Sequence, residues 1–335
     1  MNILKIYCEK DIAPLINRRA GETKFGEKIS FIKSLDDLKK NTSKFVLLGI
    51  PEDIGVRANY GNPGTSMAWS AALASFLNIQ YNSFTNAENL ILLGEIDCDV
   101  QMKQAASLTK EVNHYAEELG ELVVQIDHKV SMIIQKIIEA GKFPIIIGGG
   151  HNNSYGNLMG TSQGLNSKIN CINFDAHTDF RALEHRHSGN GFSYAFENGF
   201  LDKYFIFGLH RNYTSEGVFN SLQENNQRVG FNLFEDISVQ KKLSFSAALK
   251  EAEDFCCYNN FGIELDMDAI AMMGSSAISP SGFTVEEARI FVGRFTKNTN
   301  ARYLHICEGA PLLGLFPTQV GKTIAYLISD AISVT

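Results

Sequence analysis

The chain has 335 residues, of which 44% are hydrophobic and 20% are charged, and its formal net charge is −7. A chain of this length can bury a large apolar core. The acidic balance argues against nucleic-acid binding, which needs clustered cationic charge. No segment approaches the roughly 20 consecutive apolar residues of a transmembrane helix. The N-terminus lacks the apolar region of a signal peptide, and the six cysteines show no CxxC spacing. We therefore expect a soluble, cytoplasmic protein without a membrane partner.

Residues 1–40 carry no clear pattern and are expected to form an N-terminal extension, followed by one domain over residues 41–335. Short apolar runs that end in Gly, Asp or Glu recur along this domain. Their length and bounded apolar character predict buried strands. The runs cover residues 45–50, 90–95, 144–150, 169–175, 204–209, 228–234, 261–266 and 303–308.

Helical patterns lie between these runs. In residues 121–141, apolar side chains recur at three- and four-residue steps until Gly141, which predicts a helix. Segment 284–296 begins with Thr284 and has Glu287 three residues later, a capping-box pattern. Residues 320–333 are expected to form a closing helix. Apolar strands alternating with helices predict a three-layer α/β/α domain with a mainly parallel sheet of about eight strands.

Four of the expected strands lead into side chains that could bind metal ions. In open parallel sheets, ligands bind beyond the carboxyl ends of the strands. Residues at i and i+2 of an extended chain share a face, so the segments 175–179 and 266–268 each aim several ligands in one direction. The candidate metal ligands are His151, Asp175, His177, Asp179, Asp266 and Asp268, and Glu308 ends the last of the four strands.

Four carboxylates and two imidazoles carry too much negative charge for one site without cations. Oxygen-rich ligands with some imidazole suit Mn²⁺, and six ligands fit two ions about 3.5–4 Å apart. Each motif alone also has a structural explanation. Glycines 148–150 could form only a tight turn, segment 175–179 a surface turn, and segment 266–268 a helix cap.

The three motifs together resemble the ureohydrolase superfamily, which includes arginase, agmatinase, guanidinobutyrase and formimidoylglutamase. They read GGGH at 148–151, DAHTD at 175–179 and DMD at 266–268. The Gly-rich segment 49–65, the segment SGNGF at 188–192 and the segment ICEGAP at 306–311 add to the resemblance. It extends over about residues 45–330 and is specific for the superfamily rather than for the substrate.

The resemblance implies an arginase-like catalytic domain that binds two Mn²⁺ per subunit. His151 and Asp179 would serve one ion, His177 and Asp268 the other, and Asp175 and Asp266 would bridge the two. A metal-bridging hydroxide would attack the amidine or guanidine carbon, and a bridging Asp would relay its proton to the leaving amine. Glu308 would accept two parallel N–H bonds from the planar cation. The family also commonly forms trimers or hexamers, so we expect a homo-oligomer.

Two departures bear on the catalytic residues. Arginase-like sequences often end the third motif in Asp-Pro, where this chain has Ala271 and Met272. Arginases place a proton-shuttling histidine two residues after SGN, where this chain has Phe192. His187 is the alternative proton carrier, although it could equally be a solvated loop histidine.

The expected substrate is N-formimidoyl-L-glutamate, which would be cleaved to L-glutamate and formamide. Its two carboxylates require a cationic pocket, and arginine forks suit carboxylates. Each candidate arginine of this chain, Arg57, Arg181, Arg186 or Arg211, could also be a plain surface charge. Arginase is the alternative, followed by agmatinase or another guanidino-acid hydrolase, and the non-enzymatic alternative is a metal-free subunit. The candidate substrate-binding residues are Arg57, Arg181, Arg186, Ser188, Asn190, Arg211 and Glu308.

Overall fold

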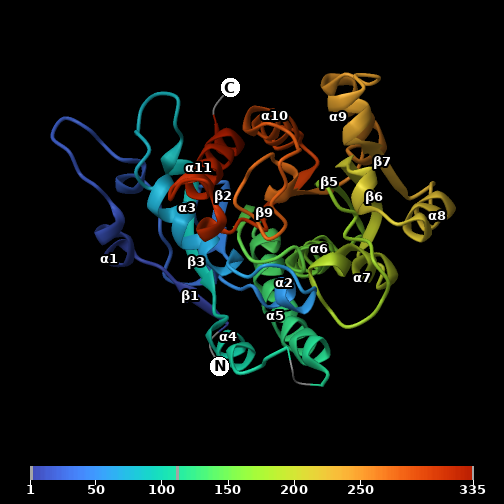
Figure 1. The fold of residues 1–335 in the computed structure, drawn as a ribbon. Coiled ribbons are helices and arrows are strands. Elements are labelled where there is room, and N and C mark those ends of the chain that lie inside the picture. Colours follow the sequence, from blue (N-terminus) through green and yellow to red (C-terminus); the bar gives the residue numbers. More distant parts are fainter. Residues whose placement is uncertain (1–2, 111–112, 334–335) are drawn as a thin grey trace.

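The computed structural model describes residues 3–110 and 113–333. Residues 1–2 of the expected extension and 334–335 of the expected domain lie outside this part. The centre of the fold is a sheet of nine strands in the order β1-β3-β2-β4-β9-β8-β5-β6-β7 (Figure 1). The eight strands after β1 are parallel. Their bounds are β2 Phe45–Gly49, β3 Leu90–Ile96, β4 Phe143–Ile147, β5 Ile169–Phe174, β6 Leu201–Leu209, β7 Val229–Leu233, β8 Phe261–Asp266 and β9 Ala301–Cys307.

All eight strands expected from the apolar runs are present, and the three-layer α/β/α class is confirmed. The ninth strand, β1 (Leu4–Ile6), was not predicted. It pairs antiparallel with β3 at one edge of the sheet. Three residues are too few to show a strand pattern in the sequence. Farther along the N-terminal segment, Ile12 and Phe25 are fully buried and belong to the apolar core.

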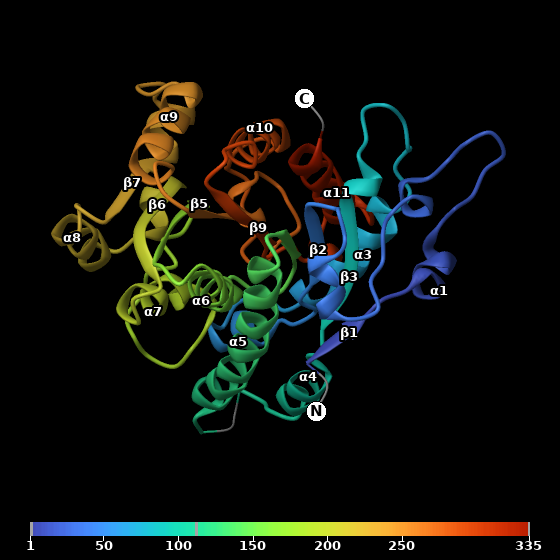
Figure 2. The same cartoon turned by 180° about the vertical axis from the view of Figure 1, so that it is seen from behind.

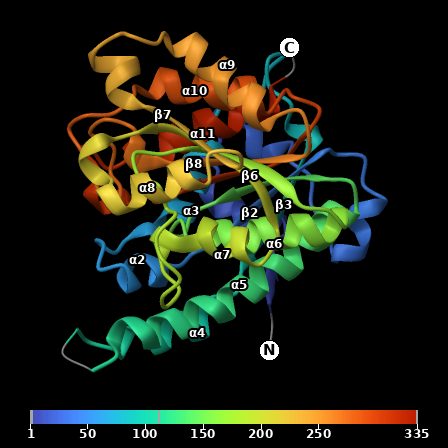
Figure 3. The same cartoon turned by 90° about the vertical axis from the view of Figure 1, so that its right-hand side faces the viewer.

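Helices cover both faces of the sheet, which explains why its strands are apolar throughout (Figures 2 and 3). Helices α3 and α9 to α11 pack on one face, and α5 to α8 pack on the other. The helix bounds are α1 Glu9–Ile12, α2 Ile54–Ala58, α3 Ala68–Phe76, α4 Asp99–Ala106, α5 Tyr115–Glu139, α6 Asn153–Leu165, α7 Gly191–Glu197, α8 Glu216–Glu224, α9 Phe245–Cys256, α10 Val285–Phe295 and α11 Gln319–Ile332. Among the described residues, none of these helices is both long and apolar enough to cross a membrane.

The three helices expected from sequence are α5, α10 and α11. Helix α5 begins six residues earlier than expected, at Tyr115. The capping box of α10 is confirmed, because the Thr284 hydroxyl accepts a hydrogen bond from Glu287 N at 3.1 Å and the Glu287 carboxylate accepts one from Thr284 N at 2.8 Å.

Candidate metal centre

The candidate ligands are carried by four neighbouring strands in the middle of the sheet. Strands β4, β9, β8 and β5 are consecutive in the sheet order. All four run in the same direction, so their carboxyl ends open on one rim. Residues 148–151 follow β4, Asp175 follows β5, Asp266 ends β8 and Glu308 follows β9. The fold therefore brings segments separated by more than a hundred residues to one place, as the sequence predicted.

A tight glycine turn places His151 at this rim. Gly148 and Gly149 adopt positive φ angles of 91° and 71°, which residues with a Cβ rarely tolerate. A Cβ on Gly149 would also lie only 2.7 Å from Oε1 of the buried Glu52. That same Glu52 oxygen accepts a hydrogen bond from Gly150 N at 3.0 Å. The hydrogen bond to Glu52 thereby fixes the turn. The His151 ring, which follows the turn, is fully buried.

Three carboxylates converge on one nitrogen of His151. Its Nδ1 lies 2.8 Å from Asp179 Oδ2, 3.2 Å from Asp266 Oδ2 and 3.3 Å from Asp175 Oδ2. These four residues form one group that could hold a metal ion. Asp179 reaches this position through a left-handed backbone conformation, with φ of 44°, that is uncommon outside glycine.

A second group lies beside the first and shares one residue with it. His177 Nδ1 lies 3.0 Å from Asp268 Oδ2 and 3.7 Å from Asp175 Oδ1. Asp175 therefore presents one oxygen to each group. Asp266 Oδ2 faces the first group, and its Oδ1 accepts the N–H of Asp268 at 2.8 Å. All six residues expected as ligands are thus within two adjoining groups.

The chemistry of these groups fits divalent cations. Burial, and then the neighbouring Asp175, raises the pKa of Asp179 to about 6. Burial, with the charges of Asp268 and Asp175, raises the pKa of Asp266 well above its usual range. Both ring nitrogens of His151 and Oδ1 of Asp268 are buried without a hydrogen-bond partner among the described residues. Cations would neutralise the crowded carboxylates and could take Nδ1 of His151 and Oδ1 of Asp268 as ligands.

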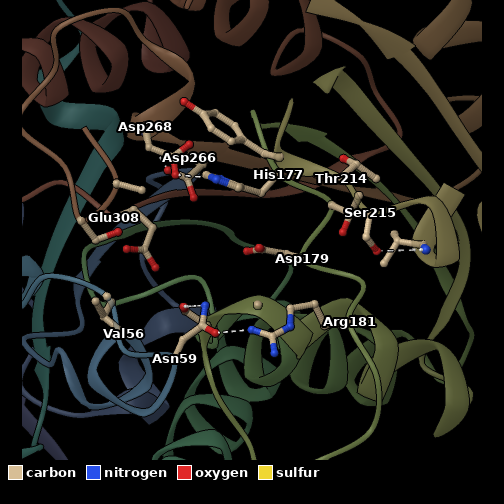
Figure 4. Close-up of a pocket in the computed structure, with 18 residues that line it drawn as sticks. Val56, Asn59, His177, Asp179, Arg181, Thr214, Ser215, Asp266, Asp268 and Glu308 are labelled. Carbon is tan, nitrogen blue, oxygen red and sulfur yellow. Dashed lines mark hydrogen bonds and ion pairs between the residues drawn. The ribbon is translucent and has the colours of Figure 1, made fainter. Parts of the chain in front are cut away.

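A pocket of about 380 Å³ opens beside the two groups (Figure 4). Asp179, Asp266, Asp268, His177 and Glu308 line one end of it. The other lining residues are Val56, Asn59, Gly61, Thr178, Arg181, Ser188, Gly189, Tyr213, Thr214, Ser215, Val218, Ser276 and Ala277.

Glu308 is buried and has one oxygen free. Its Oε1 accepts the N–H of His151 at 2.7 Å, and its Oε2 has no partner among the described residues. Burial raises the pKa of Glu308 to about 8. A cationic ligand in the pocket would therefore favour the charged carboxylate and could use its free oxygen.

Of the four arginines expected to bind substrate, only Arg181 lines the pocket. Arg57 donates to Ala105 O at 2.6 Å, and Arg211 pairs with Asp236 at 2.6 Å. Arg186 is 3% exposed and pairs with Asp127 of α5 at 3.0 Å. The structure thus places these three guanidinium groups among other partners, outside the pocket.

The two residues of segment 188–190 that were expected to bind substrate also differ in where they lie, because one lines the pocket and the other does not. Ser188 lines the pocket and its Oγ accepts a hydrogen bond from Asn59 Nδ2 at 3.2 Å. Asn190 is fully buried outside the pocket, where it donates to His185 O at 2.9 Å. Its role is to hold the shape of the loop rather than to face the cavity.

His187 is oriented away from the pocket. Its Nε2 lies 3.0 Å from Glu184 Oε1, and its Nδ1 accepts the N–H of Gly189 at 3.0 Å. Both nitrogens of His187 are thus engaged within its own loop. Burial lowers the pKa of His187 to about 4.

Phe192, at the position where arginases have the proton-shuttling histidine, is fully buried. Its ring contacts the His151 ring, with 5.1 Å between centroids.

Several pocket residues were missed by sequence reasoning. The Tyr213 ring stacks on the His177 ring with centroids 4.9 Å apart, and Thr214 and Ser215 follow it in the wall. These residues come after the carboxyl end of β6, so the rule that ligands bind beyond the carboxyl ends of parallel strands could have marked them. Asn59 lies just after α2 within the Gly-rich segment, and nothing in its local pattern marks it as a pocket residue.

Comparison with known proteins agrees with the geometry. The model of the arginase family matches residues 43–331. The formimidoylglutamase of Geobacillus thermodenitrificans is 26% identical over 288 residues, which cover 83% of this chain and 79% of the relative. The crystal structure of formimidoylglutamase from Bacillus subtilis superposes with a TM-score of 0.75 at 18% identity, covering 94% of this chain and 93% of that one. The structure of Trypanosoma cruzi formiminoglutamase with Mn²⁺ gives a TM-score of 0.71 at 20% identity, covering 93% and 97%.

Proposed function

Because this chain belongs to the arginase family and is a hydrolase of the ureohydrolase type, we propose that it cleaves N-formimidoyl-L-glutamate to L-glutamate and formamide. One water molecule is consumed and the C–N bond between the formimidoyl carbon and the glutamate nitrogen is broken. The observation that carries the proposal is that one pocket is lined both by candidate metal ligands and by an arginine. Asp266, Asp268 and His177 lie on one side of the pocket, and Arg181 lies across from them (Figure 4).

The ligand groups support two manganese ions per subunit. His151, Asp179, Asp175 and Asp266 would hold one ion, and His177, Asp268 and Asp175 would hold the other. The family resemblance implies that Asp266 also bridges to the second ion. A donor set rich in carboxylate oxygen with one imidazole on each ion suits Mn²⁺. When bound, such a pair supplies Lewis acidity and lowers the pKa of water.

Glu308 is the residue that would orient the planar amidine. Its Oε1 is fixed by the backbone of His151, and its Oε2 is free to accept an N–H from the substrate. The charged amidinium would also stabilise the anionic carboxylate, whose pKa burial raises to about 8. Binding of the cation and ionisation of Glu308 therefore support each other.

Asp266 is the better placed of the two shared carboxylates to carry a proton to the leaving nitrogen. It lines the pocket, whereas Asp175 is fully buried and does not. We therefore assign proton transfer to the Asp266 carboxylate rather than to His187, whose ring is held by Glu184.

The far end of the pocket favours a substrate that carries carboxylates. Arg181, Asn59 and Ser188 supply a guanidinium, an amide and a hydroxyl there. Every carboxylate among the described lining residues belongs to the metal-binding end. Arginine would bring an α-ammonium group, and agmatine brings no carboxylate at all. The Arg181 guanidinium favours the dianionic glutamate moiety over both.

A substrate panel tests the proposal. The purified full chain, loaded with Mn²⁺, is given N-formimidoyl-L-glutamate, arginine, agmatine and guanidinobutyrate, and formamide, urea and ammonia are scored separately. We expect formamide from the first substrate at a kcat/KM at least about tenfold above the others, a difference of ~1.4 kcal/mol in transition-state binding. Urea from arginine as the main product would establish the arginase alternative.

Metal content tests the non-enzymatic alternative. We expect close to two Mn²⁺ per chain after loading and desalting, and a chain that retains no metal would instead be a scaffold subunit. The homo-oligomeric state, as a trimer or hexamer, stays a prediction from the family resemblance, and the cytoplasmic location stays a prediction from the cysteine usage. Light scattering during size-exclusion chromatography measures the first of these.

A further inference from the structure

A glutamate and a histidine are buried together beneath the metal centre, on the two strands that carry Asp266 and Glu308. Glu264 of β8 and His305 of β9 face each other across the sheet, and both side chains are fully buried. His305 Nδ1 lies 2.5 Å from Glu264 Oε2. Burying a carboxylate is costly unless it is paired and hydrogen-bonded, so this pair calls for an explanation.

The pair is connected to the turn that carries His151. The Nε2 of His305 donates to the carbonyl oxygen of Gly148 at 3.2 Å. Both nitrogens of His305 face acceptors, so the ring links Glu264 to the glycine turn. Tyr303 completes the network, since its hydroxyl donates to Glu264 Oε1 at 2.8 Å. Both oxygens of Glu264 are thus held in fixed positions.

The second nitrogen of His151 faces this network. While Nδ1 of His151 is surrounded by three carboxylates, its Nε2 lies 3.5 Å from Glu264 Oε2. That distance is at the outer limit of a hydrogen bond, and Nε2 has no hydrogen-bond partner among the described residues. Glu264 therefore offers an anionic acceptor on the side of the imidazole opposite to the metal-binding side.

The thiol of Cys307 is the competing neighbour of His151. Its Sγ donates to the carbonyl oxygen of Leu265 at 3.6 Å. The side chain of Cys307 is fully buried. A neutral sulfur is a weak acceptor compared with a carboxylate. Glu264 is therefore the partner that can fix the tautomer of His151.

We propose that Glu264, clamped by His305, is a positioning residue that orients His151 for the first metal ion. A hydrogen bond from Nε2–H to Glu264 selects the tautomer whose Nδ1 lone pair faces Asp175, Asp179 and Asp266. An anionic acceptor behind the ring also makes the imidazole a stronger metal donor. His305 contributes by holding both Glu264 and the turn that carries His151. This inference rests on the proposed binuclear site.

Metal affinity of the purified full chain tests the proposal. Metal-free wild type and Glu264→Gln are titrated with Mn²⁺ by calorimetry, and the bound ions are followed by electron paramagnetic resonance. Glutamine keeps the volume of Glu264 and removes its charge. We expect one of the two Mn²⁺ equivalents to bind about 10–100-fold more weakly, the usual cost of losing a residue that supports a ligand. The equivalent held by His177 and Asp268 should keep its affinity.

Tyr303→Phe is the matched control, because it removes a hydrogen bond from the same carboxylate without touching His151 or Gly148. It should bind both ions like the wild type. His305→Gln provides a second variant if Glu264→Gln does not fold, and it too should weaken only one ion. Equal affinities in wild type and Glu264→Gln would overturn the inference while the proposed function stands. A parallel loss at both ions, with lower thermal stability of the metal-free protein, would show a merely structural role and also overturn it. Failure of the wild type to bind Mn²⁺ would instead refute the proposed function.

Discussion

Arg181 and Asn59 join the two sides of the pocket mouth. Nη1 of Arg181 donates to Oδ1 of Asn59 at 2.6 Å (Figure 4). Its Nη2 pairs with Glu184 at 2.9 Å. The Arg181 side chain is 51% exposed, so its ion pair contributes little to folding, about 0–1 kcal/mol. These partners can therefore be exchanged for a substrate carboxylate at small cost. Arginine suits this exchange, because its planar fork matches a carboxylate in two hydrogen bonds.

Replacing Arg181 with glutamine should weaken the binding of dianionic substrates and leave the binding of agmatine unchanged. A lost hydrogen bond to a charged group costs about 1.5–3 kcal/mol. We therefore expect the KM for N-formimidoyl-L-glutamate to rise roughly 10-fold or more, since 1.4 kcal/mol corresponds to a factor of ten. Any residual turnover of agmatine, which has no carboxylate, should keep its KM. Steady-state kinetics on both substrates gives the comparison.

Arg211→Gln is the control for this experiment. Arg211 is also partly exposed and ion-paired, with Asp236, but it lies outside the pocket. It should leave both KM values unchanged. Equal effects of Arg181→Gln on the two substrates would remove Arg181 from the carboxylate-binding end.

Asp175→Asn and Asp266→Asn should each abolish measurable turnover. Asp175 presents an oxygen to each ligand group, so an asparagine at this position would weaken the binding of both ions. Asp266 lines the pocket and faces His151, so its amide would remove a shared charge and the proton carrier. Activity assays together with metal analysis distinguish loss of metal from loss of chemistry.

Asp254→Asn, at a carboxylate that is 63% exposed on α9, provides the matched control and should keep full activity. Wild-type turnover in either Asp175→Asn or Asp266→Asn would refute the assignment of shared ligands. Retained metal with lost turnover in Asp266→Asn would support its role in proton transfer.

The sheet and the ligand groups could be predicted because their signals are local and repeated. Each buried strand is an apolar run with a polar end, and the parallel topology sends all such ends to one rim. The positions of Asp175 and Asp266 follow directly from this rule. The order β4-β9-β8-β5 could not be deduced from the runs themselves, since it depends on how helices pack between distant strands.

The pocket wall was harder to predict because it is built from irregular segments. Side chains along a strand point alternately to the two faces of the sheet, but no such period determines where side chains of a loop point. Arg181 and Arg186 lie five residues apart in the same loop, yet one faces the cavity and the other is buried against Asp127. Sequence gives both the same charge, and only the packing of α5 against the loop separates them.

Breaking the buried pair between Arg186 and Asp127 should destabilise the fold. The side chains are 3% and 2% exposed, and Nε of Arg186 lies 3.0 Å from Asp127 Oδ2. Removing one partner of a buried pair leaves an uncompensated charge, which costs about 3–5 kcal/mol. We expect Arg186→Met to lower the free energy of unfolding by about this amount in urea denaturation. Arg186→Met combined with Asp127→Leu should recover most of the loss, and full stability of the single variant would contradict the burial of the pair.

His187 should make the stability of the protein depend on pH in the mildly acidic range. Burial lowers its pKa from an ordinary value of 6.5 to about 4. Between these values the unfolded chain takes up a proton that the folded ring does not, so stability falls with falling pH. The stabilisation is complete above pH 6.5 and is lost progressively as the pH approaches 4. His187→Asn keeps an acceptor for Gly189 N and removes the titrating ring. The difference in unfolding free energy between wild type and this variant should therefore shrink as the pH decreases through that window. Two-dimensional NMR titration of the imidazole checks the cause, and a ring that titrates near 6.5 would show that His187 is not held neutral by its loop.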